Sequence, residues 1–191
     1  MRKQWTMIIF LMLMGCSLFI NPGKAANEII ITSYEAGAYV GFNGVKAYLA
    51  QKVINGTLAG DSLTAKHTKY ATTKTSYVTL GDNLVLYMNA PQAALLTNIQ
   101  GVVTGVGAAL ADLSDGKLKQ VGPRMKYVPH PQMKMTLRAT QVSPEMISFA
   151  IDTLLGLIEI LANYTGSLTA DDKLAYQNRI QMAQKAIPDW V

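Results

Sequence analysis

Residues 76–88 read Ser76-Tyr-Val-Thr-Leu80-Gly-Asp-Asn-Leu84-Val-Leu-Tyr-Met88, and this stretch decides the predicted fold class. Two runs rich in β-branched, aliphatic and aromatic residues flank Gly81-Asp82-Asn83, a composition that is common in turns. The pattern is typical of a β-hairpin with a three-residue loop. The stretch therefore predicts two antiparallel strands.

Three other segments complete the predicted non-helical part of the chain. Residues 28–32 contain three isoleucines and predict a short strand. Residues 117–141 predict a second strand region, because apolar and polar side chains alternate over 133–140. Residues 57–75 are rich in Thr and Lys, and we expect a loop there.

The first two predicted helices are residues 35–54 and 92–113. The first places Phe42, Val45, Leu49 and Val53 on one face, and its three glycines, at 37, 41 and 44, predict the close approach of a neighbour. The second follows Pro91, ends before Gly116, and aligns Gly101, Gly105, Ala108 and Asp112 on a narrow face. We expect a neighbouring helix to pack closely there.

The remaining predicted helices lie at 146–164 and from Thr169 to about Ala186. Ser143-Pro144-Glu145 is a strong helix start, and the helix that follows is apolar except for one narrow stripe. The stripe consists of Ser148, Asp152, Glu159 and Asn163. We expect this helix to be the core helix, with the stripe facing water.

The order of these segments predicts an α+β fold. Strands and helices do not alternate regularly enough for a doubly wound parallel sheet. We therefore expect a single globular domain over residues 26–191, with about four helices and a small, mainly antiparallel sheet.

Residues 1–25 have the three parts of a secretory signal peptide. Two basic residues precede an uncharged apolar run over 7–20, and small residues follow a helix-breaking Asn-Pro pair. The apolar run is shorter than the roughly 20 residues that a bilayer-spanning helix needs. The sequence therefore predicts export.

Two cleavage points remain open. Gly23-Lys24-Ala25 favours cleavage before Ala26 and a soluble product. Leu13-Met-Gly-Cys16 is similar to a bacterial lipobox, in which residues 1–15 are removed and Cys16 is lipidated. Membrane association through Cys16 is therefore the alternative to a soluble product.

Export changes the charge and the cysteine content. The leader contains Arg2, Lys3 and Lys24 but no acid, so removing residues 1–25 lowers the net charge from +5 to +2. The high isoelectric point therefore does not indicate nucleic-acid binding. Cys16 is the single cysteine, so the mature chain is not expected to form an internal disulfide.

The candidate partner site is a run of basic residues without an acid. It consists of Lys117, Lys119, Arg124, Lys126, Lys134 and Arg138. If these cations share one surface, they would attract an anionic envelope partner. No catalytic or cofactor motif stands out, and no metal site is expected from His67 and His130, the two histidines of the chain.

These features favour an exported protein of the periplasm or bacterial cell envelope that binds or scaffolds a partner. An accessory subunit of a surface or secretion assembly is the form we expect. One alternative is a small envelope hydrolase whose triad is assembled from distant residues. Another is a lipid-binding or membrane-active protein that uses the apolar segments 92–113 and 146–164.

The first prediction concerns processing. Mass spectrometry of the protein from its native host should give a chain that begins at Ala26, or one that begins at a lipidated Cys16. A mature chain that keeps Met1 would contradict export.

Overall fold

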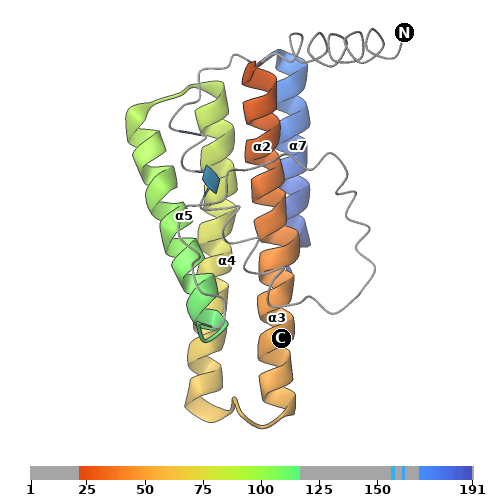
Figure 1. The fold of residues 1–191 in the computed structure, drawn as a ribbon, viewed down its shortest axis with the longest axis vertical. Helices are drawn as coiled ribbons and strands as arrows, with labels where there is room; N and C mark the ends of the chain where they lie inside the picture. Colours follow the sequence, from red (N-terminus) through yellow and green to blue (C-terminus); the bar gives the residue numbers. More distant parts are fainter. Residues whose placement is uncertain (1–21, 117–155, 158–160, 162–167, 191) are drawn as a thin grey trace, which may run out of the picture.

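The structure is a computed structural model that describes residues 22–116, 156–157, 161 and 168–190. This part of the chain is a bundle of helices (Figure 1). Its elements are α2 (Pro22–Ala36), the π-helix η1 (Gly37–Phe42), α3 (Asn43–Ile54), α4 (Gly60–Asn89), α5 (Ala93–Leu113) and α7 (Ala170–Ala186).

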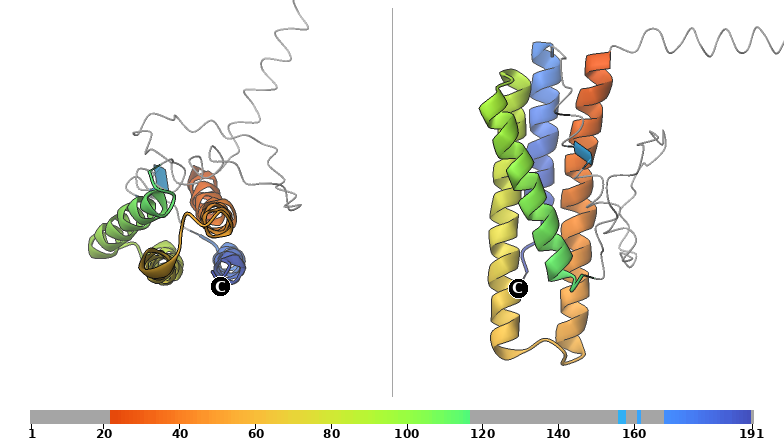
Figure 2. Two further views of the ribbon diagram at one scale, coloured as in Figure 1. Left: turned by 90° about the horizontal axis from the view of Figure 1, so that it is seen from below. Right: turned by 60° about the vertical axis from the view of Figure 1, so that its left-hand side comes forward.

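Elements α2, η1 and α3 follow one another without a break and form one long rod. A short turn reverses the chain into α4, and α5 then folds back along α4 (Figure 1). Helix α7 packs against both α2 and α4. The views in Figure 2 place Gly156–Leu157 between α5 and the α2 rod, and the side chains of Leu157 and Leu161 are fully buried there.

The predicted α+β fold is wrong, because the described residues contain helices and no strand. Residues 28–32 lie inside α2, and the predicted hairpin lies inside α4. The buried positions of α4 recur every three or four residues straight through the supposed turn. They are Tyr70, Thr73, Tyr77, Leu80, Gly81, Leu84, Tyr87 and Met88. This is the period of one helix face.

Gly81 explains why the turn signal was misleading. A Cβ atom added at Gly81 would lie 2.5 Å from the Tyr34 hydroxyl oxygen and 2.7 Å from Gln184 Nε2. Glycine is therefore needed at this position for the close approach of two other helices, and it does not mark a change of chain direction.

The predicted loop over 57–75 is also wrong, because α4 begins at Gly60. The threonines that suggested a loop lie largely on the exposed side of this helix. The hydroxyls of Thr72 and Thr75 donate to backbone carbonyls four residues earlier, at 3.0 and 3.1 Å. Their hydroxyls thus find acceptors within the helix itself, and no loop is needed to satisfy them.

Two helix predictions are confirmed closely. Helix α5 begins two residues after Pro91 and is followed by Gly116 with a φ of 64°. At α7, the Thr169 hydroxyl accepts a hydrogen bond from the Asp172 backbone N–H at 3.1 Å, and Pro188 follows the last turn.

The helix predicted at 35–54 is present as η1 and α3 and is continued upstream by α2. Phe42, Val45 and Leu49 are fully buried, as expected, but Val53 is 39% exposed. Val53 lies in the last turn of α3, next to the turn that leads into α4.

The close contact predicted on α5 is wrong. Gly101, Gly105, Ala108 and Asp112 are all exposed, and no described atom lies within 4 Å of a Cβ added at either glycine. The strand region at 117–141 and most of the helix at 146–164 lie outside the described residues. Within the latter, Gly156 is exposed and Leu157 and Leu161 are buried.

The centre of the bundle is a reciprocal contact between Tyr34 of α2 and Tyr77 of α4. Their rings stack at a centroid distance of 4.6 Å with 14° between the planes. The Tyr34 hydroxyl donates to the Tyr77 carbonyl oxygen at 2.9 Å, and the Tyr77 hydroxyl donates to the Tyr34 carbonyl oxygen. Each ring is thus anchored to the backbone of the opposite helix.

The same contact explains the π-helix. In a regular α-helix the Tyr34 carbonyl would accept from the Ala38 N–H. Here the Tyr77 hydroxyl donates to the Tyr34 carbonyl and accepts from the Ala38 N–H, so it stands between them. A side chain inserted into the hydrogen-bond ladder widens the helix at that point, which accounts for η1 from Gly37.

Gly37 makes this insertion possible, and its substitution is the second prediction. An added Cβ would lie 2.1 Å from the Tyr77 hydroxyl oxygen. Gly37→Ala should therefore lower the free energy of unfolding by about 1–3 kcal/mol or more, as other overpacked core substitutions do. Urea unfolding followed by circular dichroism measures the change.

Gly101→Ala is the matched control, because Gly101 lies inside α5 with open space around it. It should leave stability unchanged or raise it by up to about 1 kcal/mol through helix propensity. Equal effects of the two substitutions would contradict the proposed insertion.

Candidate functional site

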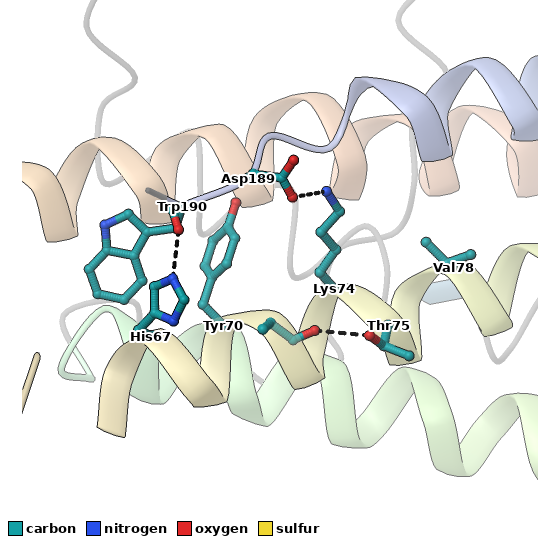
Figure 3. Close-up of a pocket in the computed structure, with 8 residues that line it drawn as sticks. His67, Tyr70, Lys74, Thr75, Val78, Asp189 and Trp190 are labelled. Atoms are coloured by element: carbon teal, nitrogen blue, oxygen red, sulfur yellow. Dashed lines mark hydrogen bonds and ion pairs between the residues drawn. The ribbon is translucent and has the colours of Figure 1, made fainter. Parts of the chain in front are cut away.

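A pocket of about 390 Å³ lies between α4 and the segment that follows α7 (Figure 3). The α4 side is formed by residues spaced three or four apart, which places them on one face of the helix. They are His67, Tyr70, Ala71, Lys74, Thr75 and Val78. Asp189 and Trp190 close the opposite side.

The segment after α7 consists of Ile187–Trp190. Pro188 disfavours a helical conformation at the preceding residue, and Ile187 is extended, with φ −66° and ψ 116°. Ile187 and Trp190 are buried, at 3% and 7% exposure. The Trp190 ring meets the Tyr70 ring edge-on at 5.9 Å and lies 5.5 Å from the His67 ring.

Side chains of α3 and α4 bind four consecutive backbone carbonyls of this segment. Lys74 Nζ donates to the Ile187 carbonyl oxygen at 3.0 Å, and the Tyr70 hydroxyl donates to the Pro188 carbonyl oxygen at 2.9 Å. Lys46 Nζ donates to the Asp189 carbonyl oxygen at 2.6 Å. His67 Nε2 contacts the Trp190 carbonyl oxygen at 2.8 Å. Recognition of the segment is therefore through groups that every peptide carries.

An ion pair adds charge recognition to these hydrogen bonds. Lys74 Nζ lies 2.6 Å from Asp189 Oδ1, and this hydrogen bond lowers the pKa of the Asp189 carboxyl. Burial raises the pKa of Tyr70 above its ordinary value, so its hydroxyl remains a donor at physiological pH. The pocket combines a fixed hydroxyl donor, a lysine and two aromatic faces.

The pocket's polar groups hold the segment and do not form a nucleophile–base pair with one another. His67 meets a carbonyl and Asp189 meets Lys74. The Thr75 hydroxyl donates to the Ala71 carbonyl of its own helix at 3.1 Å. The described lining therefore does not assemble a hydrolase triad, and the described residues hold no cluster of three His, Cys, Asp or Glu suited to a metal.

A second polar cluster joins α3, α4 and the end of α5. Lys66 lies 3.0 Å from Asp115, Lys69 lies 2.7 Å from Asp112, and Lys52 also pairs with Asp115. The Lys52 hydrogen bond is the main reason that the pKa of Asp115 falls to about 2. This cluster holds the end of α5 against the rod.

The predicted anionic-partner residues, Lys117, Lys119, Arg124, Lys126, Lys134 and Arg138, lie outside the described part of the chain, and so do Cys16 and His130. Among the predicted features, only His67 is placed in the pocket. Tyr70, Lys74 and Trp190 were missed. Their signal is the spacing of His67, Tyr70 and Lys74, which becomes visible once 57–75 is recognised as helix.

The chain was compared with protein families, curated proteins and solved structures. No protein-family model, no curated protein and no solved structure matches it. Among the described helices, α5 has the length and apolar composition to cross a membrane, with a mean hydropathy of 1.5, and 28% of that stretch is buried in the bundle.

The third prediction concerns the Asp115 cluster. The pKa of the Asp115 carboxyl is lowered in the folded chain. Its ion pairs therefore stabilise the fold above about pH 4, and this stabilisation is lost as the pH falls toward 2. Asp115→Asn should lower stability at pH 7 by up to about 1 kcal/mol, since the pair is partly exposed, and the deficit should shrink between pH 4 and 2. Urea unfolding across this range measures it.

Lys52→Met removes the main partner of Asp115 and should reproduce much of the pH-dependent loss of stability expected for Asp115→Asn. If the loss of unfolding free energy in either variant stays constant down to pH 2, the Asp115 carboxylate is not the stabilising group.

Proposed function

We propose that the chain is an exported envelope protein that binds or scaffolds a partner, as a non-enzymatic accessory subunit of a surface or secretion assembly. The single observation that carries this proposal is that the polar side chains of the pocket contact the backbone of a peptide segment. His67, Tyr70 and Lys74 all contact main-chain carbonyls of a peptide segment. The segment is the chain's own Ile187–Trp190, and the same donors are suited to the main-chain carbonyls of a partner polypeptide, while the described lining residues hold no activated nucleophile.

The signal-peptide features of residues 1–25 support the envelope location, with lipidation at Cys16 as the alternative to a soluble product. The six basic residues between 117 and 138 support attraction of an anionic envelope partner. Both remain predictions that rest on the sequence.

A lipid-binding role is the second candidate, and α5 favours it. This helix has no charged residue from Ala93 to Ala111, and Gly101, Thr104, Gly105 and Ala108 are exposed along it. Flotation of the exported protein with anionic phospholipid vesicles, lost when Thr104 and Ala108 are changed to Glu, would favour this candidate over a protein partner.

The fourth prediction tests the binding role in the native host. A photo-reactive amino acid at Thr75, which lines the pocket, should give a covalent adduct with an envelope protein. The same amino acid at Thr79 should not, although both threonines are exposed on α4 and both hydroxyls donate to the carbonyl four residues earlier. Electrophoresis and mass spectrometry identify the adduct.

Changing Lys119, Lys126, Lys134 and Arg138 together to Gln should weaken the adduct at Thr75 if the basic residues draw the same partner. Equal adducts at Thr75 and Thr79, or none at either, would count against partner binding at this face. Labelling of the exported protein by a serine-hydrolase probe would replace the proposal with the hydrolase alternative.

A further inference from the structure

The chain contains two Asn-Gly pairs, Asn43–Gly44 and Asn55–Gly56, and they lie in different surroundings. Glycine has no Cβ atom, so its backbone nitrogen can attack the side-chain amide of a preceding asparagine with little hindrance. The attack displaces ammonia and closes a cyclic imide. It requires rotation of the backbone at the asparagine and release of the glycine N–H from its hydrogen bond. The local structure therefore decides which pair can react.

Asn55–Gly56 lies in the turn between α3 and α4, at one end of the bundle (Figure 1). Both residues are exposed, and Gly56 has a φ of 67°. No described atom lies within 4 Å of a Cβ added at Gly56. The Gly56 N–H donates to the Val53 carbonyl oxygen at 3.0 Å, in the last turn of α3. Hydrogen bonds of this kind open at low free-energy cost, because helix ends fray.

The side-chain amide of Asn55 is hydrogen-bonded through its oxygen. Oδ1 accepts from Gln51 Nε2 at 2.9 Å, whereas none of the described residues accepts a hydrogen bond from Nδ2. Negative charge develops on Oδ1 when Cγ is attacked, so a donor at this oxygen favours the attack. Nδ2 is the atom that leaves as ammonia, and no hydrogen bond to a described residue retains it.

Asn43–Gly44 lies inside the long rod, where η1 passes into α3. Gly44 is buried, and the side chains of Phe42 and Val45 on either side of the pair are fully buried. Asn43 Nδ2 donates to the Tyr39 carbonyl oxygen at 2.9 Å, so the nitrogen that would leave is bound to the rod. Rotation at Asn43 would interrupt the rod within the core, which costs far more free energy than fraying of a terminal turn.

We propose that Asn55 is a site of spontaneous deamidation through a cyclic imide formed with Gly56, and that the fold protects Asn43. The Gly56 backbone nitrogen loses its proton and bonds to Asn55 Cγ. The Cγ–Nδ2 bond breaks, and ammonia leaves with that proton. Water then opens the imide at either of its two carbonyl carbons, which gives aspartate or isoaspartate at position 55.

The product places a new carboxylate at the C-terminal end of α3. The helix dipole disfavours a negative charge at this end. The carboxylate also lies three residues after Lys52, at a spacing that makes two residues neighbours on a helix, and Lys52 is an ion-pair partner of Asp115. Deamidation therefore introduces a competitor for the cation that holds the end of α5 against the rod.

The fifth prediction compares the two Asn-Gly pairs within one folded chain. The exported protein is incubated in mildly alkaline buffer, because the attacking nitrogen must lose its proton. Peptide mapping by mass spectrometry should show deamidation at Asn55 about tenfold or more faster than at Asn43, since opening of the rod limits the reactive population at Asn43. In urea, which removes the fold, the two rates should be similar.

Enzymatic methyl labelling of isoaspartate gives a second readout. Asn55→Gln should remove most of the label from the folded chain, because glutamine would have to close a larger, six-membered ring. Asn178→Gln is the matched control, because Asn178 is exposed on α7 but is followed by Arg179, and it should leave the label unchanged. Circular dichroism verifies that both variants are folded.

Equal rates at Asn43 and Asn55 in the folded chain would overturn the protection assigned to the rod. If Asn55 stays intact in the folded chain while both asparagines react in urea, the assignment of the site itself is wrong. Persistence of the label in folded Asn55→Gln would also overturn it. The partner-binding function is tested separately at Thr75, so its failure and that of the deamidation site are distinguishable.

Discussion

The mutual insertion of Tyr34 and Tyr77 sets the distance between α2 and α4, and the arrangement of the bundle depends on it. Two buried hydroxyls must find hydrogen-bond partners, because an unsatisfied one would cost about 1–3 kcal/mol. Each finds a carbonyl of the opposite helix. That solution requires glycine beside each hydroxyl, at Gly37 and Gly81, because a Cβ at either position would overlap the facing ring.

A line of aromatic rings connects this contact with the pocket. Phe42 meets Tyr77 at 5.2 Å and Tyr70 at 5.6 Å, both edge-on, and Tyr70 in turn meets Trp190. Tyr70 and Tyr77 are two turns apart on the same face of α4. The face that packs against the rod at Tyr77 is therefore continuous with the face that binds the segment at Tyr70.

Helix α7 brings the segment to this face through polar contacts. Arg179 forms hydrogen bonds with Glu28 and Glu35 of α2, and Gln184 Nε2 donates to the Val78 carbonyl and to Asp82 of α4, both at 2.9 Å. Gln184 lies over Gly81, where a larger residue would displace it. The same glycine thus admits Tyr34 to the core and lets α7 approach α4.

Local signals in the sequence predicted the ends of α5 and α7 but failed on α2 and α4, which were read as strands and a loop. Pro91, Gly116, Thr169 and Pro188 act through the backbone of adjacent residues, so their effects at the ends of α5 and α7 could be read directly. Gly81 is needed because the ring of Tyr34, which is 47 residues away in the sequence, packs against it. Its neighbours in the sequence could not show this, and the prediction of a turn was wrong. The pocket was missed for the same reason, because its residues on α4 were assigned to a loop and Trp190 joins them only through the tertiary fold.

The contacts that hold Ile187–Trp190 differ in how far they depend on the side chains of this segment. Hydrogen bonds to main-chain carbonyls are available to any extended peptide, so they contribute affinity without distinguishing sequences. The Lys74–Asp189 pair is largely exposed on the aspartate side and contributes little for that reason. The part of the contact that depends on side chains therefore lies mainly in the two buried anchors, Ile187 and Trp190, and above all in the tryptophan, whose ring lies 5.9 Å from that of Tyr70 and 5.5 Å from that of His67. Without the Trp190 ring the segment would keep its main-chain hydrogen bonds and lose the burial that favours its position against α4.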